Sequence, residues 1–439
     1  MKTVKSRHTT GIICFLLLLV SGLSSCGKSS LNDEAAATIE GFNYVPSGNI
    51  SRRVILSDND GNILEDQIID RSALGITVGS TLANRDRLTS YQVHILMPGR
   101  NQLGQFYCEI YSFTNVESGT DFSVSAKSIT GQDYAPARVD LLSDNENLEG
   151  YSWSLSNGHN HFALDPVETT SSGALRFSAH GNLPVEKASA IFSYVTNFTR
   201  SGNYYWRYWD NIRGPYNDTV SITQFEKQTE PSRFIFANEG SPEYLRIRID
   251  ATLGDTDYII FNRFSREPQT WNEYYFPSMS FDAYATEVEF SSTSSAGTSI
   301  SKTYTHKDAG ISSEISFADD LISDVSQAGT GFSYSCHNEV SGVEALFYGE
   351  KEQNYLSWHV TGPAEEGNKQ LSLPPLFDYI ATEYDLGVKI PTEMKWLKAY
   401  RTTMAKNYPE FQKYFMNKTF GEPSYNIGFK EETMKIILN

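Results

Sequence analysis

The sequence predicts a mainly β protein of tandem antiparallel β-sandwich-like domains, with a short helical segment near the C-terminus. Short stretches of alternating apolar and polar residues recur along most of the 439-residue chain. Aromatic residues, which favour half-buried sheet surfaces, make up 13% of it. Apolar residues at three- and four-residue steps, which are typical of a helix, follow residue 390.

The first 25 residues have the order of a secretory signal. Basic residues precede an apolar run at 11–20, which is too short to span a bilayer comfortably. Small residues and then Cys26 follow at the expected cleavage point. The sequence therefore predicts export to the cell envelope, with a plain secreted protein or an uncleaved anchor helix as alternatives.

The segment Leu23-Ser24-Ser25-Cys26 resembles the lipobox of bacterial lipoproteins. The resemblance implies that residues 1–25 are a lipoprotein signal peptide, that Cys26 receives lipid, and that 26–37 is a tether. Gly27 follows the cysteine where an inner-membrane retention signal often has Asp, so the resemblance implies an outer-membrane location. The predicted membrane contact is the lipid on Cys26.

The net charge of −17 excludes nucleic acid as a partner, because a field of this sign repels phosphate. Neutral sugars, cations and proteins remain open as partners. No cofactor is expected, since no P-loop and no dinucleotide fingerprint is present.

Residues 38–130 are predicted to form a β-sandwich of short strands. Its first hairpin turns at Asp60-Gly61, where glycine supplies the positive φ of a tight turn. Residues 131–439 are predicted to form a large antiparallel β domain, or two domains divided near 280. Leu245, Ile247 and Ile249 give its clearest half-buried strand.

A helix is predicted over about 391–408, and it is expected to kink or end near Pro409. The apolar residues that suggest this helix are Leu397, Tyr400, Met404, Tyr408 and Phe411. A last strand is predicted at 434–438. The two cysteines outside the signal, Cys108 and Cys336, are far apart in sequence, and Cys108 is expected to be a buried free thiol rather than a disulfide partner.

Two histidines give a weak candidate for a metal site. On a strand, His159 and His161 would share one face, and Asp165 follows four residues later. Ordinary loop histidines explain the same residues, so no metal is predicted, and no catalytic residue is assigned.

Two dense aromatic clusters are the candidate ligand contacts. They supply Trp206 and Trp209 in one segment, and Trp271 and Tyr274 in another. Aromatic rings stack on the apolar faces of sugars while neighbouring polar groups bond hydroxyls. The alternative is that these rings fill a β core.

The lipobox and the β-rich acidic body resemble uncharacterised surface lipoproteins of the Bacteroidota type. Asp218-Thr219-Val220 matches a tripeptide that is O-glycosylated in that group, which implies Thr219 as an acceptor. Our first hypothesis is a non-enzymatic envelope lipoprotein that binds a glycan or a partner protein. The alternatives are a surface hydrolase of glycan or peptide, metal-assisted through His159 and His161, and a structural subunit of a surface complex.

Overall fold

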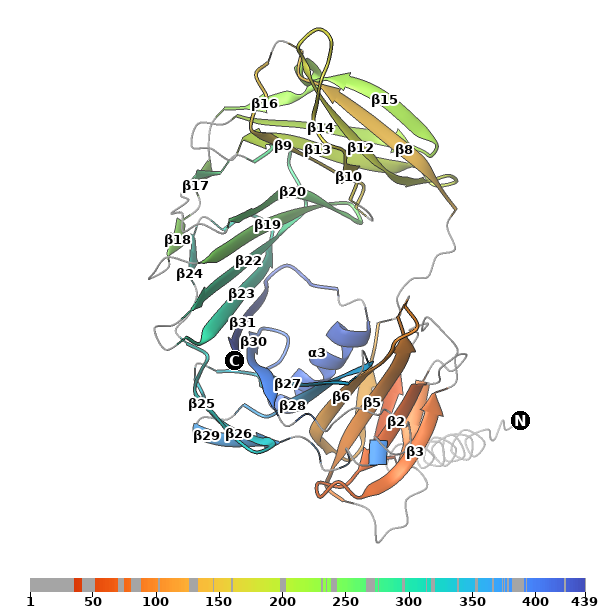
Figure 1. Ribbon diagram of the computed structural model, residues 1–439, viewed down its shortest axis with the longest axis vertical. Coiled ribbons are helices and arrows are strands. Elements are labelled where there is room, and N and C mark those ends of the chain that lie inside the picture. Colours follow the sequence, from red (N-terminus) through yellow and green to blue (C-terminus); the bar gives the residue numbers. More distant parts are fainter. Residues whose placement is uncertain are drawn as a thin grey trace, which may run out of the picture.

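The fold is that of a computed structural model (Figure 1). It describes residues 35–41, 52–69, 75–79, 88–101, 103–125, 133–144, 146–158, 161–197, 203–229, 232–233, 235–237, 243–265, 273–274, 276–293, 297–312, 314–316, 320–337, 339–351, 354–364, 367–372, 374, 376, 379–380, 391, 393–421 and 424–438. The signal peptide, Cys26, His159 and Trp271 lie outside these residues. Within the described part, no helix is long and apolar enough to cross a membrane.

A twelve-stranded sheet runs through most of the molecule (Figure 1). Its strands, in spatial order, are β20 (Thr256–Ser265), β19 (Tyr244–Leu253), β22 (Ala283–Thr293), β23 (Ser299–Asp308), β31 (Phe429–Ile437), β30 (Met394–Thr402), β27 (Gly342–Lys351), β28 (Asn354–Gly362), β6 (Phe106–Glu117), β5 (Ser90–Arg100), β2 (Arg52–Ser57) and β3 (Ile63–Ile69). All neighbours are antiparallel except β28 and β6, which are parallel.

The other described strands form smaller sheets. A four-stranded sheet has the order β16 (Glu226–Gln228), β14 (Tyr204–Ile212), β13 (Ser189–Asn197), β9 (Tyr151–Ser156). A five-stranded sheet contains β10 (Ala163–Leu164), β12 (Leu175–Pro184), β8 (Tyr134–Leu142) and β15 (Tyr216–Ser221), with β11 (Glu168–Thr169) paired to β12. The three-stranded sheets are β4 (Gly75–Val78), β1 (Ala37–Glu40), β7 (Thr120–Ser123), and β25 (Ile322–Ala328), β26 (Gly331–Cys336), β29 (Gly367–Ser372). Two short pairs are β17 (Ser232–Arg233) with β21 (Glu273–Tyr274), and β18 (Ile235–Ala237) with β24 (Glu314–Ser316).

The four-stranded sheet is the middle layer of the upper part of the molecule in Figure 1. One of its faces packs on the five-stranded sheet, through residues such as Val195 and Val139. Its other face packs on β19 and β20, through residues such as Tyr204 and Ile247. A sheet that is buried on both faces needs apolar residues at successive positions, and this explains the dense aromatic run of β14.

The long sheet also has a core on each face. The sheet β25–β26–β29 packs on one face, where Phe332 meets Phe347. Helix α3 (Tyr408–Phe420) packs on the other face near β5 and β6, where Phe415 contacts Phe113. The predicted mainly β fold with a C-terminal helix is confirmed.

The long sheet crosses the residue positions at which we predicted domain boundaries, 130 and about 280. A buried chain of polar contacts links strands on the two sides of the first predicted boundary. The His94 ring lies 3.0 Å from the Ser57 hydroxyl and 2.6 Å from that of Ser112, and the Trp358 indole N–H donates to Ser112 at 2.7 Å. Hydrogen bonding therefore joins the N-terminal strands directly to β28, and the domain boundaries themselves stay a prediction.

The helix predicted over about 391–408 is wrong in position. Residues 394–402 form the strand β30, and α3 begins only at Tyr408. Pro409 does not end this helix but lies in its first turn, where the missing N–H is harmless. Asn407 caps the helix by accepting the Glu410 N–H at 3.0 Å.

Other local predictions are confirmed. The hairpin β2–β3 turns at 58–62, where the Asp58 carboxylate accepts the backbone N–H of Asn62 at 2.7 Å. The last strand, β31, contains the predicted segment up to Ile437. Cys108 and Cys336 are both buried and form no disulfide, and burial raises the pKa of the Cys108 thiol to about 12.

Candidate functional site

Trp206 and Trp209, two of the predicted ligand contacts, lie on opposite faces of β14. Trp206 belongs to the core that faces β19 and β20, and it is 7% exposed. Trp209 packs against the core that faces the five-stranded sheet, with the Arg207 guanidinium 4.8 Å above its ring. Because side chains alternate along a strand, residues three apart do not share a face. The two indoles therefore do not form one stacking surface.

Of the remaining predicted residues, Tyr274 and His161 lie within the described part of the chain. Tyr274 lies in the short strand β21. His161 is exposed, while its predicted partner His159 lies outside the described residues. Partial burial of the His161 ring, together with the Arg248 charge, lowers its pKa. Asp165 pairs with His180 at 3.4 Å instead. No group of three or more His, Cys, Asp or Glu side chains suited to a metal occurs among the described residues.

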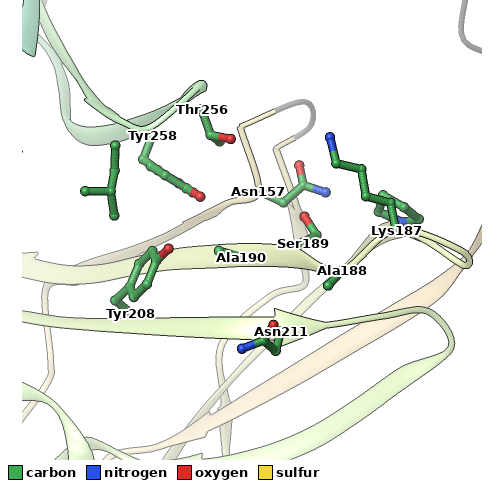
Figure 2. Close-up of a pocket in the computed structure, with 11 residues that line it drawn as sticks. Asn157, Lys187, Ala188, Ser189, Ala190, Tyr208, Asn211, Thr256 and Tyr258 are labelled. Atoms are coloured by element: carbon green, nitrogen blue, oxygen red, sulfur yellow. The ribbon is translucent and has the colours of Figure 1, made fainter. Parts of the chain in front are cut away.

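The structure places a hollow of about 250 Å³ between the middle layer and the hairpin β19–β20. We call it the Tyr208 hollow. Figure 2 shows Ser189, Tyr208 and Asn211 on strands β13 and β14, Thr256 and Tyr258 on the hairpin opposite, and Asn157 and Lys187 from neighbouring turns. Its described lining carries phenols, amides, hydroxyls and one ammonium group but no carboxylate.

A β-bulge brings Asn211 to this hollow. In the pairing of β13 with β14, Ser189 is opposite Ile212 and Ile191 is opposite Trp209, so two residues of β14 oppose one of β13. Asn211 takes up the extra length with φ 55°, a conformation that asparagine tolerates better than most residues. Bulges of this kind commonly redirect a side chain beside a binding site.

The opposite wall is held in place by a close backbone approach. Gly158 has φ 79°, and a Cβ atom built on it would lie 2.1 Å from the Thr256 methyl carbon. Only glycine allows the 157–158 turn to approach the hairpin this closely. The result is that Asn157 and Thr256 line the same hollow.

Two tyrosines meet at the floor of the hollow. The rings of Tyr208 and Tyr258 contact edge to face, with centroids 5.8 Å apart. Burial, followed by the neighbouring Tyr208 phenol, raises the pKa of Tyr258. The Tyr258 phenol therefore stays protonated at neutral pH, and both tyrosines carry hydroxyl groups that can donate or accept hydrogen bonds.

A second, more open hollow of about 470 Å³ also has Tyr208 in its lining, and we call it the Trp206 hollow. Arg207 donates to the Gln224 side chain at 2.7 Å, while the buried Trp206 indole N–H has no hydrogen-bond partner among the described residues. The other lining residues are Glu226 and Met279. Of the predicted contacts that the structure describes, only Trp206 lines either hollow. The sequence analysis missed Tyr208, although it lies in the same aromatic run.

No family model and no curated protein matches the chain. Among solved structures, it is similar to the tetra-tandem repeat in the extending region of a large adhesion protein, at 9% identity and a TM-score of 0.12, over 85% of this chain and 96% of that one. It is also similar to Escherichia coli alpha-2-macroglobulin activated by porcine elastase, at 9% identity and a TM-score of 0.11, over 84% of this chain and 41% of that one. Neither similarity is strong enough to support an inference about function.

Proposed function

We propose that the protein is an outer-membrane lipoprotein, anchored through Cys26, that binds a glycan in the Tyr208 hollow. The observation that carries the proposal is the chemistry of the lining. An aromatic surface lies beside two primary amides and two hydroxyls, a combination that suits the apolar faces and hydroxyl groups of a sugar.

The size of the two hollows supports a chain-like ligand. The Tyr208 hollow is slightly smaller than sites for drug-sized molecules, so it accommodates about one sugar unit. The Trp206 hollow is larger and shares Tyr208 with it. A glycan with one unit in each would pass beside the ring of Tyr208, and the Trp206 ring would contact the second unit.

The charge of the lining limits the class of glycan. Lys187 is the charged group in the described lining of the Tyr208 hollow, and it is exposed at the rim. A neutral or acidic sugar is therefore accommodated without like-charge repulsion, although the chain as a whole is strongly acidic.

The test is a glycan screen with the mature chain carrying Cys26→Ala, followed by affinity measurements on the best ligand. Tyr208→Ala is expected to weaken binding at least about tenfold, as for loss of a central aromatic contact. Tyr134→Ala is the matched control, because Tyr134 is a 44% exposed tyrosine on β8 outside both hollows. Equal affinity of the Tyr208→Ala variant and the parent would contradict the proposal.

A further inference from the structure

A second cluster of aromatic side chains lies on the long sheet, on the face that carries α3. Strand β28 lies between β6 and β27. Its Tyr355 is opposite Tyr107 of β6, and its Ser357 is opposite Glu109 of β6 on one side and Tyr348 of β27 on the other. Residues directly opposite each other in neighbouring strands project from the same face. All three tyrosines are half-buried.

The rings of Tyr107, Tyr355 and Tyr348 stack in a row. Tyr107 and Tyr355 are nearly parallel, with centroids 5.5 Å apart, and Tyr355 and Tyr348 are 6.2 Å apart. The end of the Tyr107 ring lies over Gly99, since a Cβ there would be 2.4 Å from the ring. The Tyr107 ring thus leans toward β5, and each of the three half-buried rings keeps part of its surface exposed.

Two carboxylates lie within this aromatic stack. Glu109 follows Tyr107 on the same face of β6 and accepts a long hydrogen bond of 3.4 Å from the Tyr111 phenol. Glu350 accepts one of 3.2 Å from the Tyr348 phenol. Within the described part of the chain, neither carboxylate forms an ion pair, although ion pairs are frequent elsewhere on the long sheet.

We propose that Tyr107, Glu109, Tyr348, Glu350 and Tyr355, here called the tyrosine platform, bind an arginine side chain that a partner protein presents. Charge complementarity decides the class of ligand, because two unpaired carboxylates repel an anionic polymer and attract a cation. The ring faces attract a cation as well. A guanidinium suits the platform better than an ammonium, because it is planar, stacks on rings and binds a carboxylate through two N–H groups.

The surroundings of the platform indicate a polypeptide rather than a free amino acid. The aromatic face continues through Tyr111 and His359, which stack at 4.6 Å, to Trp396 on β30. Glu344 holds the His359 ring through a contact of 2.7 Å. From β6 to β30 this face spans four strands, or about 14 Å at the usual strand spacing, which is wider than one guanidinium. Lys435, whose ammonium group lies 6.0 Å from the centre of the Trp396 ring, adds a positive charge at the Trp396 end of this face, away from the two carboxylates.

The test titrates the mature chain carrying Cys26→Ala with a short peptide of alternating glycine and arginine, by calorimetry. The same peptide with citrulline in place of arginine removes the charge and keeps the shape. The arginine peptide is expected to bind, more weakly at high salt, and the citrulline peptide is expected not to bind.

Glu109→Gln, which keeps the shape of the side chain, is expected to weaken arginine-peptide binding about tenfold. Glu117→Gln is the matched control, since Glu117 is an exposed carboxylate on the same strand outside the platform. Tyr355→Leu should weaken binding similarly, whereas Tyr355→Phe should change it less than about twofold because the ring is kept.

Three results would overturn the proposal: no binding of the arginine peptide, equal binding of the citrulline peptide, or an unchanged affinity in Glu109→Gln. Binding of a neutral oligosaccharide that Tyr355→Leu abolishes would also overturn it, in favour of a sugar surface. Because Tyr208→Ala should leave peptide binding unchanged, this outcome is separate from that of the proposed glycan site.

Discussion

The Tyr204 hydroxyl donates a 2.6 Å hydrogen bond to the backbone carbonyl of Ile260, and both groups are buried. Ile260 is the extra residue of a bulge in β20, since Ile249 is opposite Phe261 and Asp250 is opposite Ile259. The bond thus joins the middle layer to the long sheet. It also fixes the separation of the two strands that carry Tyr208 and Tyr258.

Tyr204→Phe should destabilise the protein and loosen the Tyr208 hollow. The substitution leaves the buried Ile260 carbonyl without its donor, at a cost of about 1–3 kcal/mol in the free energy of unfolding. Urea unfolding measures this cost, with Tyr134→Phe as the exposed control. A cost within error of the control would show that the bond does not hold the layers together.

Gly158→Ala should be more harmful than Gly254→Ala. Both glycines have positive φ, 79° and 61°, but a Cβ at Gly254 meets nothing within 4 Å. The left-handed backbone costs alanine about 1 kcal/mol at either position. At Gly158, the contact with Thr256 adds at least about 1 kcal/mol more. Equal unfolding free energies of the two variants would contradict the close approach that shapes the hollow.

Acid should weaken the fold through His94. Burial lowers the pKa of this histidine to about 3, while the unfolded value is near 6.5. Between these values the unfolded chain binds a proton that the folded chain does not. Stability is therefore complete above pH 6.5 and falls as the pH drops toward 3, with a slope that approaches about 1.4 kcal/mol per pH unit.

His94→Gln should flatten this pH dependence, although it also lowers stability at neutral pH. Urea unfolding at several pH values between 7 and 4 measures the slope, and His180→Gln serves as the control because its side chain is 58% exposed. An unchanged slope in His94→Gln would mean that another group carries the acid sensitivity.

Cys26→Ala should move the protein from the membrane fraction to the soluble fraction, because lipid on this thiol is the proposed anchor. Two acyl signals are needed for stable anchoring, so loss of the modified residue is expected to abolish it. Detergent phase partitioning and mass spectrometry of the mature N-terminus measure the effect. An unmodified thiol in the parent protein would contradict the lipoprotein proposal.

The sequence predicted the strands well where one face is buried. Leu245, Ile247 and Ile249 alternate with charged residues, and they form β19 with their apolar side chains in the core. It failed for β30, because Tyr400 lies in the core on the face that carries α3, while Leu397 and Ala399 lie in the core on the opposite face. Apolar residues on both faces of a strand imitate the three- and four-residue spacing of a helix.

The candidate site was predictable only in part. The aromatic run 204–209 indicated a strand that contributes to both hollows, but the choice of tryptophan over tyrosine did not identify Tyr208. Asn157, Lys187 and Thr256 lie far apart in sequence and meet through the packing of two sheets. The parallel pairing of β28 with β6, which builds the tyrosine platform, is likewise a contact between distant segments that no local pattern specifies.

The most direct test of the glycan proposal is hydrogen–deuterium exchange of the mature chain with and without the best glycan from the screen. Protection is expected in 187–190, 208–211 and 253–258, the segments that line the Tyr208 hollow. Protection confined to 107–111 and 355–359 would place the sugar on the tyrosine platform and contradict the account.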